Sequence, residues 1–181
     1  LPTLLELAAR TGTAVAALEY RLAPEWPYPA ALEDAYAGLV WLTGQGAGLG
    51  LDVTRVVVTG VSAGGGLAAA TALLARDRGG PVLAGQMLVY PMLDDRNNSP
   101  SAVQMAGAGT WDRTANATAW RAYLGDRAGG GDVTAHEAPA RATDLLDLPP
   151  TFIDVGSAET FRDEDIAYAT RLWRHGGEAE L

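Results

Sequence analysis

Hydrophobic positions along this chain follow a helical spacing in some stretches and a strand-like spacing in others. Apolar residues recur at helical spacing in the stretch that follows Pro2 and stops near Gly12, and again over residues 30–42, 67–76 and 162–174. We expect helices there, and in the last of them we expect Ile166, Ala169 and Trp173 to share one face. Short apolar or β-branched runs predict strands over residues 14–18, 55–59, 86–90 and 151–155. Strands that alternate with helices predict an α/β fold.

Three segments lack such a pattern. Residues 21–29 contain three prolines, so we expect no regular element there. Glycines at 44, 46, 48 and 50 predict a flexible connection, because they lack the Gly-x-Gly-x-x-Gly register and precede a strand instead of following one. Residues 93–147 are rich in Gly, Asp, Asn and Ala and predict one helix, over 114–124. We interpret them as a cap-like excursion over the sheet, within a single domain of residues 1–181.

Composition narrows the chemistry. The 181 residues include 13 basic and 22 acidic side chains, for a net charge of −9, and every basic residue is Arg. Without Lys the chain cannot form a P-loop or a Schiff base, and without Cys it has no thiol nucleophile, thiolate metal site or disulfide. The acidic balance argues against a nucleic-acid partner, and the longest apolar runs are far shorter than the ~20 residues of a membrane span. The two histidines, His136 and His175, are too far apart in sequence for a His-x-x-x-His metal pair.

One motif carries specific chemistry. Gly60-Val61-Ser62-Ala63-Gly64 reads Gly-x-Ser-x-Gly and lies between a predicted strand and a predicted helix, which is the context of a nucleophile elbow. In such a turn the serine hydroxyl projects above the sheet, and glycines on both sides let the backbone pass close by. We expect Ser62 to be a nucleophile and the N–H of Ala63 to donate to a developing oxyanion. The alternative is a tight turn with an idle serine.

Further motifs extend this interpretation over nearly the whole chain. Residues 60–65, the stretch Tyr20-Arg21-Leu22-Ala23-Pro24-Glu25, residues 28–34 and the Leu-Pro-Pro-Thr-Phe of residues 148–152 closely resemble the hormone-sensitive-lipase-like esterases of the α/β-hydrolase superfamily, in the same order and at the same spacings. The resemblance implies an α/β-hydrolase fold, with a mostly parallel, doubly wound sheet, helices on both faces, and both ends incomplete. It also implies a carboxylic ester hydrolase with a Ser, acid, His triad and no cofactor. We expect residues 20–25 to be scaffold, with Arg21 placed to pair with Glu25.

A carboxylate just beyond the strand over 151–155 is the expected acid, because this fold takes its triad in the order serine, acid, histidine. Residues 159–164 read Glu-Thr-Phe-Arg-Asp-Glu, where the resembled family has Asp-Pro-Leu-Arg-Asp-Glu with the triad Asp first. Glu159 therefore takes the triad position, and a glutamate can also orient an imidazole. Asp163 is the alternative acid, but a carboxylate at the start of a helix also suits the helix dipole.

Neither histidine is expected to be the base. His175 falls at the far end of the last predicted helix, about 18 Å from its start, where it suits a helix C-terminus. His136 precedes the acid and lies in the irregular segment, where a surface or capping role is expected. We expect the family's His-Gly-Gly-Gly loop to precede Leu1 and its histidine to follow Leu181, so that the sequence is the middle of a longer esterase.

These expectations describe a cytoplasmic serine esterase that acts on a small-molecule ester with a short-to-medium acyl group, and they leave a homodimer open. Met105, Trp111 and Trp120 are candidates to line an acyl or alcohol pocket, or for ordinary packing. Three alternatives stand beside the esterase. One is a non-catalytic protein that binds a small ligand on the same scaffold, as plant gibberellin receptors do. The others are a deacetylase of a small acetylated metabolite or sugar, and an inactive gene fragment.

Overall fold

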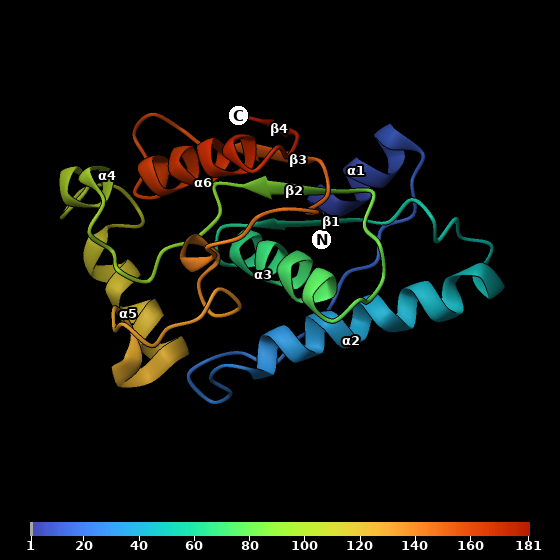
Figure 1. Ribbon diagram of the computed structural model, residues 1–181, viewed down its shortest axis with the longest axis horizontal. Coiled ribbons are helices and arrows are strands. Elements are labelled where there is room, and N and C mark those ends of the chain that lie inside the picture. Colours follow the sequence, from blue (N-terminus) through green and yellow to red (C-terminus); the bar gives the residue numbers. More distant parts are fainter. Residues whose placement is uncertain (1) are drawn as a thin grey trace.

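Four parallel strands form one sheet in the computed structural model, which describes residues 2–181 (Figure 1). In chain order and in sheet order they are β1 (Val57–Val61), β2 (Gly85–Val89), β3 (Thr151–Asp154) and β4 (Ala179–Glu180). The register places Gly60 beside Leu88 and Leu88 beside Ile153. Because the strands are parallel, their carboxyl ends lie at one edge of the sheet, where ligands of open α/β sheets bind. The predicted α/β fold with a parallel sheet is confirmed.

The described chain has six α-helices: α1 (Pro2–Thr11), α2 (Ala30–Gln45), α3 (Ala63–Asp77), α4 (Pro100–Gln104), α5 (Arg113–Leu124) and α6 (Arg162–Arg174). Short 3₁₀ turns are η1 (Gly46–Leu49), η2 (Gly125–Arg127) and η3 (Pro139–Arg141). Helices α3 and α6 cover the same face of the sheet, and α2 packs on α3. Helix α1 lies behind the sheet in the view of Figure 1.

The main hydrophobic core lies between the sheet and helices α3 and α6. Leu88 and Ile153 are fully buried against Leu73 of α3 and Tyr168 and Leu172 of α6. Side chains alternate between the two faces of a strand, so the neighbours of these core residues point the other way. The large apolar side chains on the other face include Val57, Val61 and Phe152, which are 54%, 51% and 44% exposed among the described residues.

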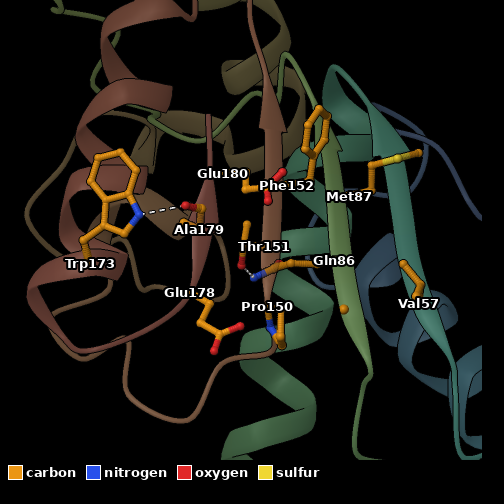
Figure 2. A pocket seen from close by; sticks show the side chains of 11 residues that line it. Val57, Gln86, Met87, Pro150, Thr151, Phe152, Trp173, Glu178, Ala179 and Glu180 are labelled. Atoms are coloured by element: carbon orange, nitrogen blue, oxygen red, sulfur yellow. Dashed lines mark hydrogen bonds between the residues drawn. The ribbon is translucent and has the colours of Figure 1, made fainter.

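A hollow of about 590 Å³ lies at the amino-terminal ends of the strands (Figure 2). Its lining includes Val57, Phe152 and Trp173, whose indole N–H donates to the carbonyl of Ala179 at 2.8 Å. Because it lies at the amino ends of parallel strands, this hollow is at the opposite edge of the sheet from the Gly-x-Ser-x-Gly turn.

Several predicted elements are confirmed and others are wrong. The helix over 162–174 has the predicted bounds, and the helix after Pro2 ends where expected, with Gly12 at φ +66°. Residues 14–18 form no strand, because a strand needs a hydrogen-bonded neighbour and, within residues 2–181, β1 pairs only with β2. The glycines at 44 and 46 do not form a flexible loop, because α2 continues through Gln45 and η1 follows it directly. Helix α4 was not expected.

The buried face of α6 differs from the predicted one. Ile166 and Trp173 are 41% and 48% exposed, and of the three expected residues only Ala169 is buried. Asp165, Tyr168 and Leu172 turn toward the core instead. The pattern failed because a carboxylate, Asp165, occupies a core position that hydrophobic spacing would reserve for an apolar residue.

The carboxyl group of Asp165 is fully buried, and neither of its oxygens has a hydrogen-bond partner among the described residues. Burial, together with the nearby carboxylates Glu164 and Glu159, raises its pKa to about 10. The folded protein therefore keeps Asp165 protonated at pH values where the unfolded chain ionises it. This difference costs stability that grows as the pH rises from about 4 toward 10.

We predict that Asp165→Asn removes this pH-dependent cost. At pH 8 the variant should have a melting temperature at least about 3 °C above that of the parent protein, and the gain should shrink steadily toward pH 4. Thermal denaturation followed by circular dichroism at pH 4, 6 and 8 measures this trend. Asp126→Asn, at an exposed aspartate, is the control and should show no such trend. A gain that is constant across these pH values would contradict the prediction.

Candidate functional site

Ser62 lies in the turn between β1 and α3 with an unusual backbone conformation. Its φ of 57° and ψ of −119° fall in a region that residues with a side chain rarely adopt. Three backbone hydrogen bonds hold it there. The Ser62 N–H donates to the Val89 carbonyl at 2.9 Å, and the Ser62 carbonyl accepts from the N–H groups of Gly66 and Met92, both at 3.0 Å. The strand-turn-helix context expected of a nucleophile elbow is therefore present.

Glycines around Ser62 leave room for this turn. A Cβ on Gly60 would lie 2.0 Å from the carbonyl oxygen of Gly64, and one on Gly66 would lie 2.1 Å from the carbonyl oxygen of Met92. Gly65 packs on Pro91, where a Cβ would come within 2.9 Å of the ring. The expectation that both motif glycines are needed is wrong for Gly64, since a Cβ there would meet nothing within 4 Å beyond its chain neighbours and the nearby backbone of its own helix.

The Ala63 N–H is placed as an oxyanion donor would be. Ala63 is the first residue of α3, and the N–H groups in the first turn of a helix have no carbonyl partner within the helix. The positive end of the helix dipole adds to this field. Ser62 itself is partly exposed.

The two candidate acids are held differently. Asp163 uses both oxygens: Oδ1 accepts from the Arg162 guanidinium at 2.8 Å, and Oδ2 accepts from the Ser101 N–H at 2.8 Å. The Arg162 hydrogen bond holds the pKa of Asp163 below its usual value. Glu159 is half-buried and accepts one hydrogen bond from the described chain, from the Thr160 N–H to Oε1 at 2.8 Å. Asp163 thus fastens α4 to α6, whereas Glu159 keeps an oxygen for another donor.

Both candidate acids follow β3, whose carboxyl end lies at the same edge of the sheet as Ser62. Val61, Val89 and Asp154 are neighbours at the ends of β1, β2 and β3. The Tyr90 N–H extends this pairing by donating to the Asp154 carbonyl. The segment from Asp154 to Glu159 therefore starts beside the elbow.

The structure places both histidines away from this edge. The His136 ring bonds Asp77 at 2.7 Å, at the C-terminal end of α3 and so about 20 Å along the helix from Ser62. His175 caps the C-terminus of α6, where its Nδ1 accepts from the Leu145 N–H at 3.4 Å. Neither histidine can contact the Ser62 hydroxyl in this arrangement.

A cavity of about 280 Å³ opens beside the elbow. Its lining includes Ala63 and Ala70 of α3, Ala119 and Trp120 of α5, and residues 20–23. Trp120 is thus at a pocket, as the sequence suggested. Met105 and Trp111 do not line it: they precede α5, whose lining residues lie in its second half, and Trp111 is partly exposed.

Arg21 fixes the loop that walls this cavity. The predicted pairing of Arg21 with Glu25 is wrong. The Arg21 guanidinium instead binds Asp34 of α2 through two hydrogen bonds, at 2.7 and 2.9 Å. The Arg21 N–H donates to the same carboxylate at 3.0 Å. These bonds lower the pKa of Asp34 to about 2. Residues 20–25 therefore act as scaffold, as expected, because Arg21 joins this loop to α2.

Residues 2–181 contain no group of three or more His, Cys, Asp or Glu side chains that could hold a metal ion. None of the helices in this range is both long and apolar enough to cross a membrane.

Comparison with known proteins gives consistent matches. The family model described as the alpha/beta hydrolase fold matches residues 2–181. Esterase LipI of Mycobacterium tuberculosis (strain ATCC 25618 / H37Rv) is 40% identical over 172 residues, which cover 92% of this chain and 52% of LipI. Carboxylesterase NlhH of Mycobacterium tuberculosis (strain CDC 1551 / Oshkosh) is 40% identical over 173 residues, covering 92% and 53%. The solved structure of bacterial heroin esterase matches with a TM-score of 0.96 at 43% identity, covering 99% of this chain and 58% of that one. The chain spans about half the length of the curated relatives it matches.

Proposed function

Because this chain belongs to the alpha/beta hydrolase fold family, among its hormone-sensitive-lipase-like esterases, we propose that it carries the nucleophile and the acid of a carboxylic ester hydrolase. The observation that carries the proposal is the backbone of Ser62, held at φ 57° between a strand and a helix. Such strain persists only where surrounding contacts support it, and it is typical of catalytic turns. The same proposal includes a cytoplasmic location for the enzyme and leaves a homodimer open.

The proposed reaction starts at the Ser62 hydroxyl. Its proton passes to an imidazole base as Oγ bonds to the ester carbonyl carbon, and the Ala63 N–H donates to the oxygen that becomes negative. The carbon–oxygen bond to the alcohol then breaks, and the alcohol leaves with that proton. Water repeats the attack on the acyl-enzyme and frees the acid. Since His136 and His175 both lie far from Ser62, the proposal assigns the base to a histidine outside this sequence.

The cavity beside Ala63 supports a short-to-medium acyl group as substrate. Its volume of about 280 Å³ is close to the lower limit of ligand pockets, and small side chains such as Ala70 and Ala119 make up much of its wall. The distance of both histidines from Ser62 favours one second candidate, a protein that binds a small ester-like ligand on this scaffold without cleaving it.

We predict that Ser62→Ala, made in the complete reading frame that contains this chain, lowers the hydrolysis of p-nitrophenyl butyrate at least about 10³-fold, because no other side chain replaces the nucleophile. Initial rates of p-nitrophenol release measure the effect. Ser157→Ala, at an exposed serine of the turn that follows β3, is the control and should stay within about twofold. A parent protein that binds butyrate esters without cleaving them would support the binding protein instead, and a Ser62→Ala variant that keeps the parent rate would refute the nucleophile.

A second prediction separates the two candidate acids. Glu159→Gln should lower kcat about 10²- to 10⁴-fold, because an amide cannot stabilise the imidazolium. Asp163→Asn should lower kcat less than about tenfold and should mainly lower the melting temperature, since Asp163 fastens α4 through the Ser101 N–H. Steady-state kinetics and melting curves of the two purified variants test this. If Asp163→Asn loses more kcat than Glu159→Gln, the acids have been assigned the wrong way round.

A further inference from the structure

The loop that follows β2, residues 90–95, contacts the elbow directly and is called the β2 loop here. The Met92 N–H donates to the Ser62 carbonyl at 3.0 Å. The Met92 carbonyl lies so close to Gly66 that a Cβ there would approach within 2.1 Å. A movement of the β2 loop would therefore move the backbone of Ser62 or release the hydrogen bond that holds it.

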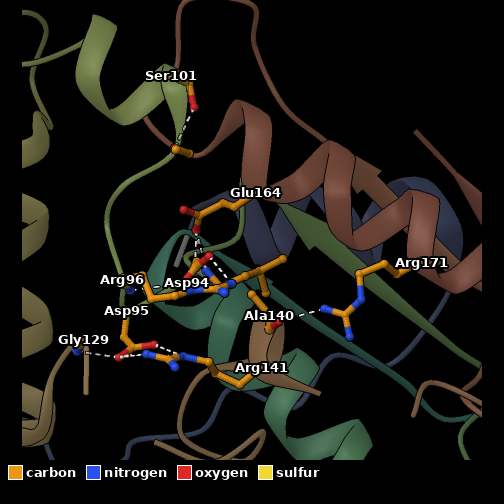
Figure 3. Close-up of polar contacts among 11 residues, drawn as sticks. Asp94, Asp95, Arg96, Ser101, Gly129, Ala140, Arg141, Glu164 and Arg171 are labelled. Carbon is orange, nitrogen blue, oxygen red and sulfur yellow. Dashed lines mark hydrogen bonds and ion pairs between the residues drawn. The ribbon is translucent and has the colours of Figure 1, made fainter. Parts of the chain in front are cut away.

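Glu164 holds the next two residues of the β2 loop (Figure 3). This side chain is 4% exposed and comes from the first turn of α6. A single oxygen, Oε1, accepts from the Leu93 N–H at 2.8 Å and from the Asp94 N–H at 3.1 Å. Without that oxygen, two buried backbone donors would lose their partner.

Glu164 also belongs to the segment that carries the candidate acid. Glu159 lies just before α6, and the turn between them is fixed by buried contacts. The Thr160 hydroxyl donates to the Trp111 carbonyl at 2.7 Å, and the Asp165 N–H donates to the Phe161 carbonyl at 3.0 Å. The Arg162 N–H also donates to the Glu159 carbonyl at 3.4 Å, so Glu159 is joined to the first turn of α6, and we call this unit the rigid segment of α6.

We propose that Glu164 is a positioning residue, whose Oε1 sets the separation between Ser62 and Glu159 by joining the rigid segment of α6 to the β2 loop. The inference rests on the proposed function, because it concerns the geometry of that triad. Its role depends on the reach and the acceptor oxygen of the side chain and not on negative charge.

The surroundings of Glu164 support a role without charge. Its pKa is raised to about 8, chiefly by burial and also by the neighbouring Asp94 carboxylate, against the opposing effects of the two backbone donors and Arg96. Asp165, the next residue of α6, is another buried carboxyl group. A neutral side chain with the same oxygen in the same place would therefore satisfy the site, and glutamine is such a side chain.

Three variants of the complete protein test this. Glu164→Gln keeps the reach and the acceptor oxygen, so kcat for p-nitrophenyl butyrate should stay within about threefold of the parent. Glu164→Asp keeps the carboxylate but withdraws it by one carbon–carbon bond, and Glu164→Ala removes it. Both should lower kcat about 10- to 100-fold, because small misplacements of reacting groups cost that much, while KM should change less than about threefold.

Leu172→Ala is the matched structural control. Leu172 is buried two turns after Glu164 and shares the main core with Leu93, but its carbonyl accepts from the His175 and Gly177 N–H groups and not from the β2 loop. It should lower the melting temperature at least as much as Glu164→Asp and leave kcat within about twofold, measured well below both melting temperatures.

Two outcomes would overturn the proposal: a Glu164→Asp variant with the parent kcat, or a Glu164→Gln variant that loses kcat as Glu164→Asp does. The Asp and Gln variants decide the matter even if Glu164→Ala does not fold. The Ser62→Ala variant in the same assay keeps the two questions apart. If Ser62→Ala abolishes hydrolysis while the three Glu164 variants do not differ in kcat as predicted, the esterase proposal stands and the positioning role fails.

Discussion

The arrangement depends on one backbone residue, Ser62, which is held in a conformation that its own side chain disfavours. Three hydrogen bonds to Val89, Gly66 and Met92 support it, and the missing Cβ atoms of Gly60 and Gly66 make the approach of their neighbours possible. Two of these partners come from β2 and its loop and not from the motif itself. The turn at Ser62 therefore depends on tertiary contacts, and whatever fixes the β2 loop also fixes the backbone of Ser62.

Buried carboxyl groups on the first turn of α6 show how such positioning costs stability. Glu164 and Asp165 are both almost fully buried, and burial raises the pKa of each well above its usual value. Glu164 has two backbone donors that offset part of this cost, and Asp165 has none among the described residues. A protein selected for stability alone would have apolar residues at these positions. Retaining Glu164 is consistent with a role in holding the β2 loop against the turn that carries Glu159.

Local signals in the sequence predicted the parts of the fold that local interactions decide. The Gly-x-Ser-x-Gly pattern predicted the turn at Ser62, and apolar spacing predicted the bounds of α6. Predictions failed where a distant partner decides: residues 14–18 have no neighbouring strand in the described chain, and Arg21 pairs with Asp34 instead of Glu25. The contact of Glu164 with the β2 loop gave no local signal, because an acidic residue in the first turn of a helix resembles an ordinary dipole partner.

The central claim is that the turn at Ser62 presents an activated nucleophile. Covalent modification by diethyl p-nitrophenyl phosphate tests it most directly, since this ester phosphorylates an activated serine and releases p-nitrophenol. We predict one phosphoryl group per chain of the complete protein, located by peptide mass spectrometry at Ser62, together with loss of ester hydrolysis. A protein that hydrolyses esters and remains unmodified, or that carries the phosphoryl group at another residue, would contradict it.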